Sequence, residues 1–131
     1  MKHLATLLLL VAAPAFATDI PMDTVVLGGL DKVAGRVSTF KDKVGETAHL
    51  GTLEIVARTC VTHPPEEQPE NAAFLEVYDT QPGKDRTKVF SGWMFASSPA
   101  LSAMDHPVYD IWVLKCESSK AKPAAKAPTE K

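Results

Sequence analysis

One stretch decides the fold of this chain: residues 90–116, FSGWMFASSPALSAMDHPVYDIWVLKC. It contains both tryptophans and five of the nine aromatic residues of the chain. At its start, Trp93 and Phe95 alternate with small or flexible residues, which predicts a strand with one aromatic face. At its end, residues 108–114 are apolar on both faces except at Asp110, which predicts a buried strand. The stretch therefore indicates the core of a small β domain.

The residues between these two strands predict a compact connection. Ser98 can cap a short helical turn that runs to Met104, with Pro99 at its first position. His106, followed by a proline, is expected to turn the chain into the last strand.

The rest of the body reads as further short strands separated by turn signals. Alternating or β-branched runs lie at residues 24–27, 33–40, 47–50, 52–59, 72–78 and 87–96. Residues 62–71 hold three prolines and three glutamates, which exclude regular structure there. We therefore predict an all-β fold, a small antiparallel β-sandwich or barrel of six to seven strands with one short helical turn.

The two ends of the chain differ from this body. Residues 1–17 have a basic start, a short apolar run and an Ala-Phe-Ala site, which predicts a secretory signal peptide cleaved after Ala17 and a periplasmic location. Residues 18–29 are expected to be a lead-in to a β domain at 30–116. Residues 117–131 contain no large apolar side chain and are expected to be a disordered Lys/Ala/Pro tail.

Charge separates the body from the tail. Residues 18–116 carry nine Lys and Arg against fourteen Asp and Glu, a net charge of −5, and residues 117–131 carry +2. An acidic body argues against nucleic acid as a partner. The lysines of the tail are typical of a solvated segment, with contact to anionic envelope polymers as the alternative.

The two cysteines, Cys60 and Cys116, each end a predicted strand. In an exported chain they predict a disulfide that ties the middle of the domain to its last strand. A redox role would favour a C-x-x-C pair, which the sequence lacks.

No recognisable catalytic, cofactor or metal site emerges from the sequence. The histidines of the body, His49, His63 and His106, do not have the spacing of metal ligands. The pairing of His106 with a neighbouring carboxylate is the simplest interpretation of that residue. Two weaker alternatives are a hydrolase built on Ser97 or Ser98, which lack a nucleophile elbow, and a carboxylate pair formed by Asp105 and Asp110.

Asp110 and the tryptophans have structural interpretations. Asp110 is the lone charge in an apolar strand, so we expect a buried carboxylate paired with Arg36 or Arg58. Trp112 is expected in the core. The alternative is that one of Trp93 and Trp112 forms part of an exposed binding patch.

Several quoted runs together resemble a known family. They include residues 30–40, 44–47, 51–53, 64–66, 90–101 and 106–110, together with both cysteines. The pattern is similar to the alphaproteobacterial family called domain of unknown function twenty-one fifty-five, and the string SGWMFASSPALSA is its most specific part. The resemblance implies a secreted envelope domain without assigned catalytic residues. Genes of the family are associated with the neighbourhood of the gene for a small accessory subunit of respiratory NADH:ubiquinone oxidoreductase, so the resemblance also hints at a partner.

The function expected from these observations is contact with a partner. We predict a non-enzymatic periplasmic interaction module, for which an inner-membrane respiratory complex is one envelope partner to consider. The candidate interface is the connection after Ser97, with Leu101, Met104 and His106 presented on a rigid support. The alternatives are that Leu101 and Met104 plug the open end of the sandwich, and that the domain binds a small ligand or a glycan.

Overall fold

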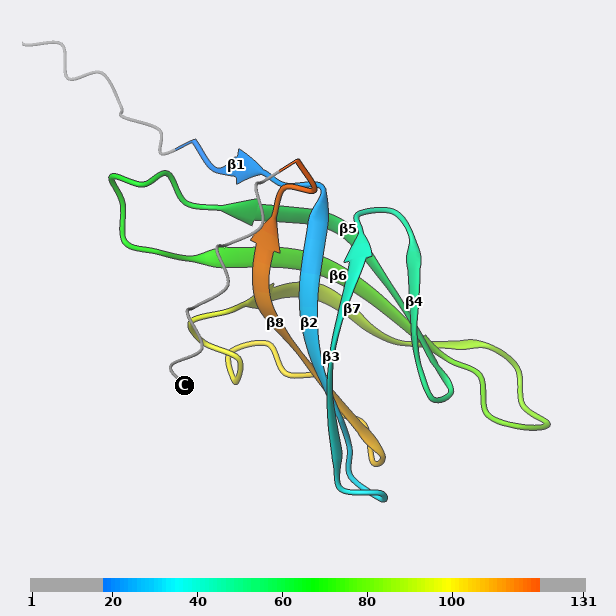
Figure 1. Cartoon of the computed structure of the whole chain (residues 1–131). Coiled ribbons are helices and arrows are strands. Elements are labelled where there is room, and N and C mark those ends of the chain that lie inside the picture. Colours follow the sequence, from blue (N-terminus) through cyan, green and yellow to red (C-terminus); the bar gives the residue numbers. More distant parts are fainter. Residues whose placement is uncertain (1–17, 121–131) are drawn as a thin grey trace, which may run out of the picture.

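The structure, a computed structural model, describes residues 18–120, which form two antiparallel sheets (Figure 1). The larger sheet has the order β1-β5-β6-β7, with β4 also paired to β5. Its strands are β1 (Ile20–Pro21), β4 (Thr47–Leu50), β5 (Leu53–Thr62), β6 (Asn71–Asp79) and β7 (Thr87–Phe95). The smaller sheet has the order β3-β2-β8, from β2 (Thr24–Asp31), β3 (Arg36–Lys43) and β8 (Tyr109–Glu117).

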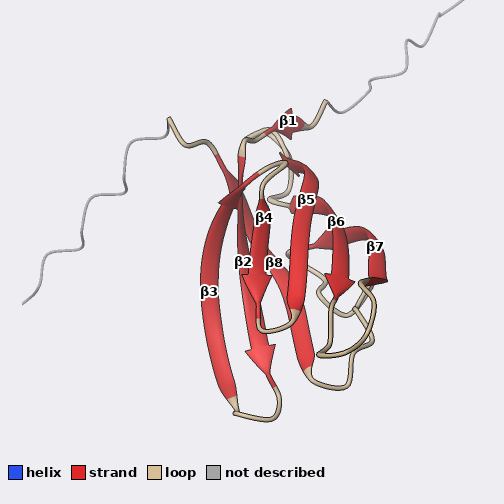
Figure 2. Ribbon diagram, turned by 90° about the vertical axis from the view of Figure 1, so that its right-hand side faces the viewer, coloured by secondary structure: helices blue, strands red, loops and turns tan. Residues whose placement is uncertain are grey.

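The two sheets pack face to face as a sandwich, which confirms the predicted fold class (Figure 2). The inward residues of each strand alternate with outward ones, as the period of a strand requires. The core side chains are mostly aliphatic: Val25, Leu27, Leu53, Ile55, Leu75, Val77, Met94, Ile111 and Val113. The strands at each end of the chain therefore contribute to the same core as those in its middle.

The disulfide between Cys60 and Cys116 is confirmed. Both cysteines are buried, with their Cα atoms 5.6 Å apart. Cys60 lies in β5 and Cys116 in β8, so the bond joins one sheet of the sandwich to the other.

The segment expected to be a lead-in is instead a central strand. β2 lies between β3 and β8, and its Val25 and Leu27 are among the most buried side chains. The prediction that the domain begins at residue 30 is wrong, because one strand runs without interruption from Thr24 to Asp31. Gly28 and Gly29 instead continue the strand.

The third strand begins later than predicted. The carboxylate of Asp31 accepts hydrogen bonds from the backbone N–H groups of Val33 and Ala34, at 2.9 and 3.0 Å. Gly35 follows with a φ of 64°, a conformation that favours glycine. This turn occupies the start of the run expected as a strand, and β3 extends through Lys43.

Two further expectations concern the connection before β8 and the tail. The predicted helical turn after Ser98 is wrong: residues 96–97 and 99–102 form turns, and residues 18–120 contain no helix. Glu117 ends β8, and Ser119 donates to Asp23, so the first residues of the expected tail belong to the fold. The remainder of the tail and the predicted signal peptide lie outside the described residues. Over residues 18–120 there is no helix with the length and apolar character needed to span a membrane.

Candidate functional site

The three predicted interface residues, which lie in the connection between β7 and β8, differ in their exposure to solvent. Leu101 is 72% exposed, whereas Met104 and His106 are each 4% exposed. The prediction of a surface position is therefore wrong for Met104 and His106. Met104 packs in the core, as the alternative that Leu101 and Met104 fill the open end of the sandwich predicts for it. Of the three residues, only Leu101 is available for contact with a partner.

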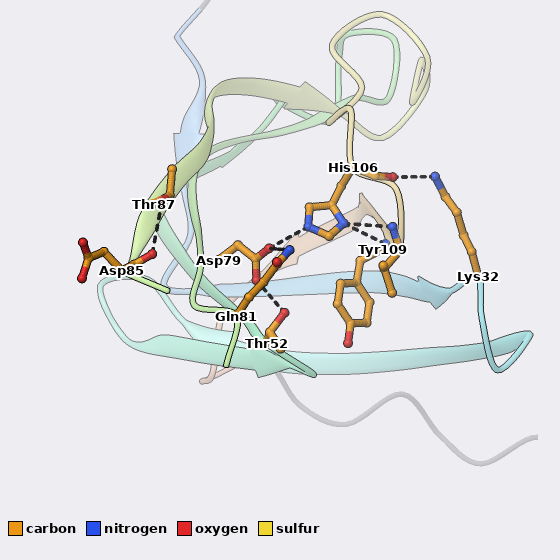
Figure 3. Close-up of polar contacts among 9 residues, drawn as sticks. Lys32, Thr52, Asp79, Gln81, Asp85, Thr87, His106 and Tyr109 are labelled. Atoms are coloured by element: carbon orange, nitrogen blue, oxygen red, sulfur yellow. Dashed lines mark hydrogen bonds and ion pairs between the residues drawn. The ribbon is translucent and has the colours of Figure 1, made fainter. Parts of the chain in front are cut away.

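His106 forms a buried polar network with Asp79 at the end of β6 (Figure 3). Its Nε2 lies 2.9 Å from the Oδ2 of Asp79. Its Nδ1 lies 3.1 Å from each of the backbone nitrogens of Val108 and Tyr109, which donate to it. Because Nδ1 is an acceptor, the proton of the neutral ring is on Nε2 and points to the carboxylate. The expected bond to a neighbouring carboxylate is replaced by one to a residue 27 positions away.

Asp79 is held as a carboxylate by three donors. Thr52 Oγ1 donates at 2.5 Å and Gln81 Nε2 at 3.1 Å, in addition to the His106 ring. Burial raises the pKa of the Asp79 carboxyl, but the bonds from Thr52, His106 and Gln81 outweigh it and keep the pKa below its usual value. The network therefore fastens the segment just before β8 to the start of β5 and the end of β6.

A histidine paired with an aspartate resembles a catalytic dyad, but in this network neither ring nitrogen of the histidine is free to act on a substrate. A general base needs an unoccupied lone pair within reach of the proton it removes. Both nitrogens of His106 are used inside the fold, and its side chain is buried. Ser97, the alternative nucleophile, donates its hydroxyl to Glu70 instead of to a histidine. The arrangement is suited to positioning the loop.

An apolar groove of about 410 Å³ lies between this loop and β8. One wall comes from Pro99, Ala100 and Ala103, and the other from Asp110 and Trp112. Met104 and Ile111, both buried, form its floor. The groove is thus a real concavity at the loop that the sequence singled out.

Trp112 is at the surface of the three-stranded sheet and not in the core, contrary to prediction. Its neighbours Ile111 and Val113 point into the sandwich, so Trp112 points out. The indole covers Gly28, its cross-strand partner, and a Cβ at that glycine would overlap the ring. The apolar pattern on both faces of β8 is explained by this glycine–tryptophan pair and by the groove.

Asp110 is also different from its prediction. Its side chain is 42% exposed, and it pairs with Lys32 at 3.1 Å instead of with Arg36 or Arg58. The same ammonium donates to the backbone oxygen of His106 at 2.8 Å. Lys32 therefore links the β2–β3 turn to the start of β8. A half-exposed pair of this kind contributes little to stability, about 0–1 kcal/mol.

A second hollow, of about 250 Å³, lies on the outer face of the five-stranded sheet. Trp93 and Phe95 of β7 form its aromatic side, with Trp93 40% exposed. Asp19, His63, Glu70 and two small apolar residues complete the lining. An exposed tryptophan was one of the alternatives that the sequence left open, whereas the carboxylates come from distant segments and carry no local signal.

The described part of the chain contains no cluster of three His, Cys, Asp or Glu side chains that could hold a metal ion. His49 is exposed on β4, and His63 lies in the loop before β6, 2.9 Å from the backbone oxygen of Gln68.

Comparison with known proteins places the chain in a family. A family model described as "Uncharacterized protein conserved in bacteria (DUF2155)" matches residues 25–116. The chain belongs to this family. The match begins in β2 and ends at Cys116, so every strand except β1, together with the disulfide, lies wholly or mostly within the DUF2155 domain.

A relative among curated proteins is "Uncharacterized protein RP359" of Rickettsia prowazekii (strain Madrid E). It is 28% identical over 87 residues, which cover 66% of this chain and 56% of the relative. The matched segment thus spans little more than half the length of that protein. No solved structure matches the chain.

Proposed function

We propose that this chain is a non-enzymatic interaction module of the periplasm, which binds a protein partner through the groove beside β8. The observation that carries the proposal is the groove itself. Ala100 lines an apolar concavity of about 410 Å³, and the next residue in the chain, Leu101, is 72% exposed. An exposed large apolar side chain next to a preformed apolar pocket is typical of the centre of a protein interface.

The support beneath the groove favours binding by contact. The buried His106–Asp79 pair and the Lys32 ammonium both bind His106 and hold the C-terminal end of the loop that forms the groove. A preorganised surface loses less conformational entropy when a partner binds, which favours affinity. The same bonds occupy the ring nitrogens of His106, which removes the best candidate for a general base.

A periplasmic location is part of the proposal. It is supported by the signal pattern of residues 1–17 and by the Cys60–Cys116 disulfide, since disulfides persist in oxidising compartments. The family resemblance makes solubilised NADH:ubiquinone oxidoreductase the first partner to examine.

The proposal is tested by capture from solubilised envelope with a tagged chain. Ala100→Glu puts a charge into the groove at an exposed position, and Leu101→Ser removes the exposed apolar side chain. Both should leave the free energy of unfolding within about 0.5 kcal/mol, because surface substitutions rarely cost more. Each should reduce the captured partner strongly, as loss of a central interface residue does.

The matched control is Thr47→Glu, which adds the same charge at an exposed position on β4, on the opposite side of the molecule from the loop (Figure 1). It should capture the partner as the wild type does. Equal capture by wild type, Ala100→Glu and Leu101→Ser would show that the groove is not the contact surface.

A small ligand or glycan is the second candidate, and the size of the groove favours it. Small-molecule pockets commonly have volumes of about 300–1,000 Å³. Native mass spectrometry of protein isolated from the periplasm distinguishes the two candidates. A bound small molecule that is lost with Ala100→Glu would favour the ligand, and an unliganded mass with intact partner capture would favour the protein interface.

A further inference from the structure

We propose that the hollow on the five-stranded sheet binds the guanidinium of an arginine side chain supplied by a partner protein. This second contact surface deepens the proposed function and rests on it only for the source of the arginine. The two surfaces lie on different sheets, with the groove beside β8 and the hollow over β5, β6 and β7.

The aromatic side of the hollow is built by cross-strand pairing. Trp93 lies opposite Phe74, and Phe95 lies opposite Ala72. The Phe74 and Trp93 rings form a T-shaped pair, with centroids 5.7 Å apart and planes at 78°, which fixes the orientation of Trp93. The small side chain of Ala72 leaves room beside the rings. Trp93 is thus a rigid aromatic surface, and tryptophan is the best partner for a cation above its face.

The polar side of the hollow is negatively charged. Asp19, just before β1, and Glu70, just before β6, both line it. Its one other titratable group is His63, and no Lys or Arg is among the residues that line it. The His63 ring places Nδ1 2.9 Å from the Gln68 oxygen, a bond in which Nδ1 donates, and its Nε2 lies 3.7 Å from Asp19. With a neutral imidazole the hollow holds two negative charges.

The two carboxylates have different roles. Glu70 accepts hydrogen bonds from the backbone N–H groups of Asn71 and Ser97, at 2.9 and 3.1 Å, and from the Ser97 hydroxyl. Burial raises the pKa of the Glu70 carboxyl, but the bonds from Ser97 and Asn71 outweigh it and lower the pKa. Asp19 is half exposed and lacks a close donor among the described residues, so it is free to pair with a ligand.

These features together match one kind of occupant. A flat aromatic surface beside a free carboxylate suits a group that is planar, positively charged and rich in N–H donors. Guanidinium has all three properties and stacks on aromatic rings, whereas an ammonium is compact and strongly hydrated. An anion or an apolar chain would leave the Asp19 carboxylate without a partner.

The test uses a single residue as the probe: Nα-acetyl-arginine amide, titrated into the chain from Thr18 to Lys131. The two indole N–H signals in a ¹H–¹⁵N spectrum report separately on Trp93 in the hollow and Trp112 beside the groove. We expect the Trp93 signal to shift and saturate at millimolar probe, and the Trp112 signal to stay in place. Nα-acetyl-citrulline amide, the neutral isostere, should bind about five- to tenfold more weakly.

Variants assign the effect to named side chains. Asp19→Asn should weaken binding about threefold or more. Trp93→Leu removes the reporting indole, so its binding is read from the backbone amide signals of Val61 and Ala72 in the lining of the hollow, and it should be abolished. Asp110→Asn is the control, because it removes a half-exposed carboxylate beside the other tryptophan, and should leave binding unchanged. The unshifted Trp112 signal in each variant shows that the fold is retained.

The outcomes distinguish this inference from the proposed function. Equal binding of the citrulline probe, or a shift at Trp112 instead of Trp93, would overturn the arginine site. Equal affinity for Nα-acetyl-lysine amide would overturn the preference for a guanidinium. Neither result depends on partner capture through the groove, which Ala100→Glu tests by itself.

Discussion

Replacing His106 by alanine should cost more stability than any surface change near the groove. The substitution removes the ring N–H that bonds to the buried Asp79 carboxylate at 2.9 Å. It also leaves the backbone N–H groups of Val108 and Tyr109 without their acceptor. The bond to the charged carboxylate contributes about 1.5–3 kcal/mol to stability. Each backbone N–H left without an acceptor adds about 1 kcal/mol to the loss, and less where water enters and accepts its hydrogen bond. We expect a loss of about 3–5 kcal/mol.

The measurement is urea unfolding followed by circular dichroism, with Thr52→Val as the matched control. Thr52 donates to the same carboxylate at 2.5 Å, but its removal strands no backbone group. Its removal should cost about 1.5–3 kcal/mol, the contribution of one bond to a charged group. A loss for His106→Ala no greater than that for Thr52→Val would refute the account of the network.

The same carboxylate predicts how stability depends on pH. The pKa of Asp79 is lowered in the folded chain, so the folded state binds this proton less readily than the unfolded state does. Its contribution is present above the unfolded pKa of about 3.9 and is lost as pH falls through the lower folded value. The free energy of unfolding should therefore fall below about pH 4, and Asp79→Asn should flatten that fall. A parallel decline in both proteins would show that other carboxyls dominate.

Three further outcomes are expected. Gly28→Ala should cost about 1–3 kcal/mol in thermal or urea unfolding, because its methyl would overlap the indole of Trp112, and Trp112→Ala should remove most of that penalty. Replacing Cys60 and Cys116 by alanine should cost about 2–5 kcal/mol, and peptide mapping without reductant should recover the cross-linked pair from the native chain. N-terminal sequencing of protein from the envelope should begin at Thr18. Material that retains the leader in the cytoplasm would contradict the predicted export.

The parts of the fold that depend on local pattern were predictable. Alternation in residues 72–78 and 87–96 corresponds to β6 and β7, and two strand-ending cysteines in a chain with a signal pattern correspond to the observed disulfide. The strand boundaries that were predicted wrongly depend on single residues whose role is not visible in the hydrophobic pattern of the sequence. Gly28 and Gly29 look like a break but are strand residues, one of which accommodates Trp112.

The parts that depend on strand pairing were not predictable. Asp110 was expected to meet an arginine, and Lys32 reaches it because β2 and β8 are neighbours. His106 was expected to bond locally, and its partner is Asp79. The hollow beside Trp93 joins the start of the domain to the loop before β6. A single sequence carries no signal for such proximities, since each depends on the order of strands in a sheet.

The position of the disulfide has a mechanical consequence. β8 is held to β2 by a ladder of backbone pairs that runs from Thr24–Glu117 to Asp31–Tyr109. A force applied to the chain after Glu117 would open this ladder one residue pair at a time, because the backbone hydrogen bonds between β8 and β2 would bear the force one after another. Cys116 lies one residue from the pulled end, so the covalent bond to Cys60 takes the load after a single pair has opened.

Beyond that point the tension passes into β5, in the interior of the other sheet. To extend further, the chain would have to shear β5 from its neighbours, which requires many bonds to break together. A tether attached after Glu117 would thus pull on the sandwich as one body and would leave the groove beside β8 intact under load. After reduction of the disulfide, the same force would separate β8 from β2 pair by pair.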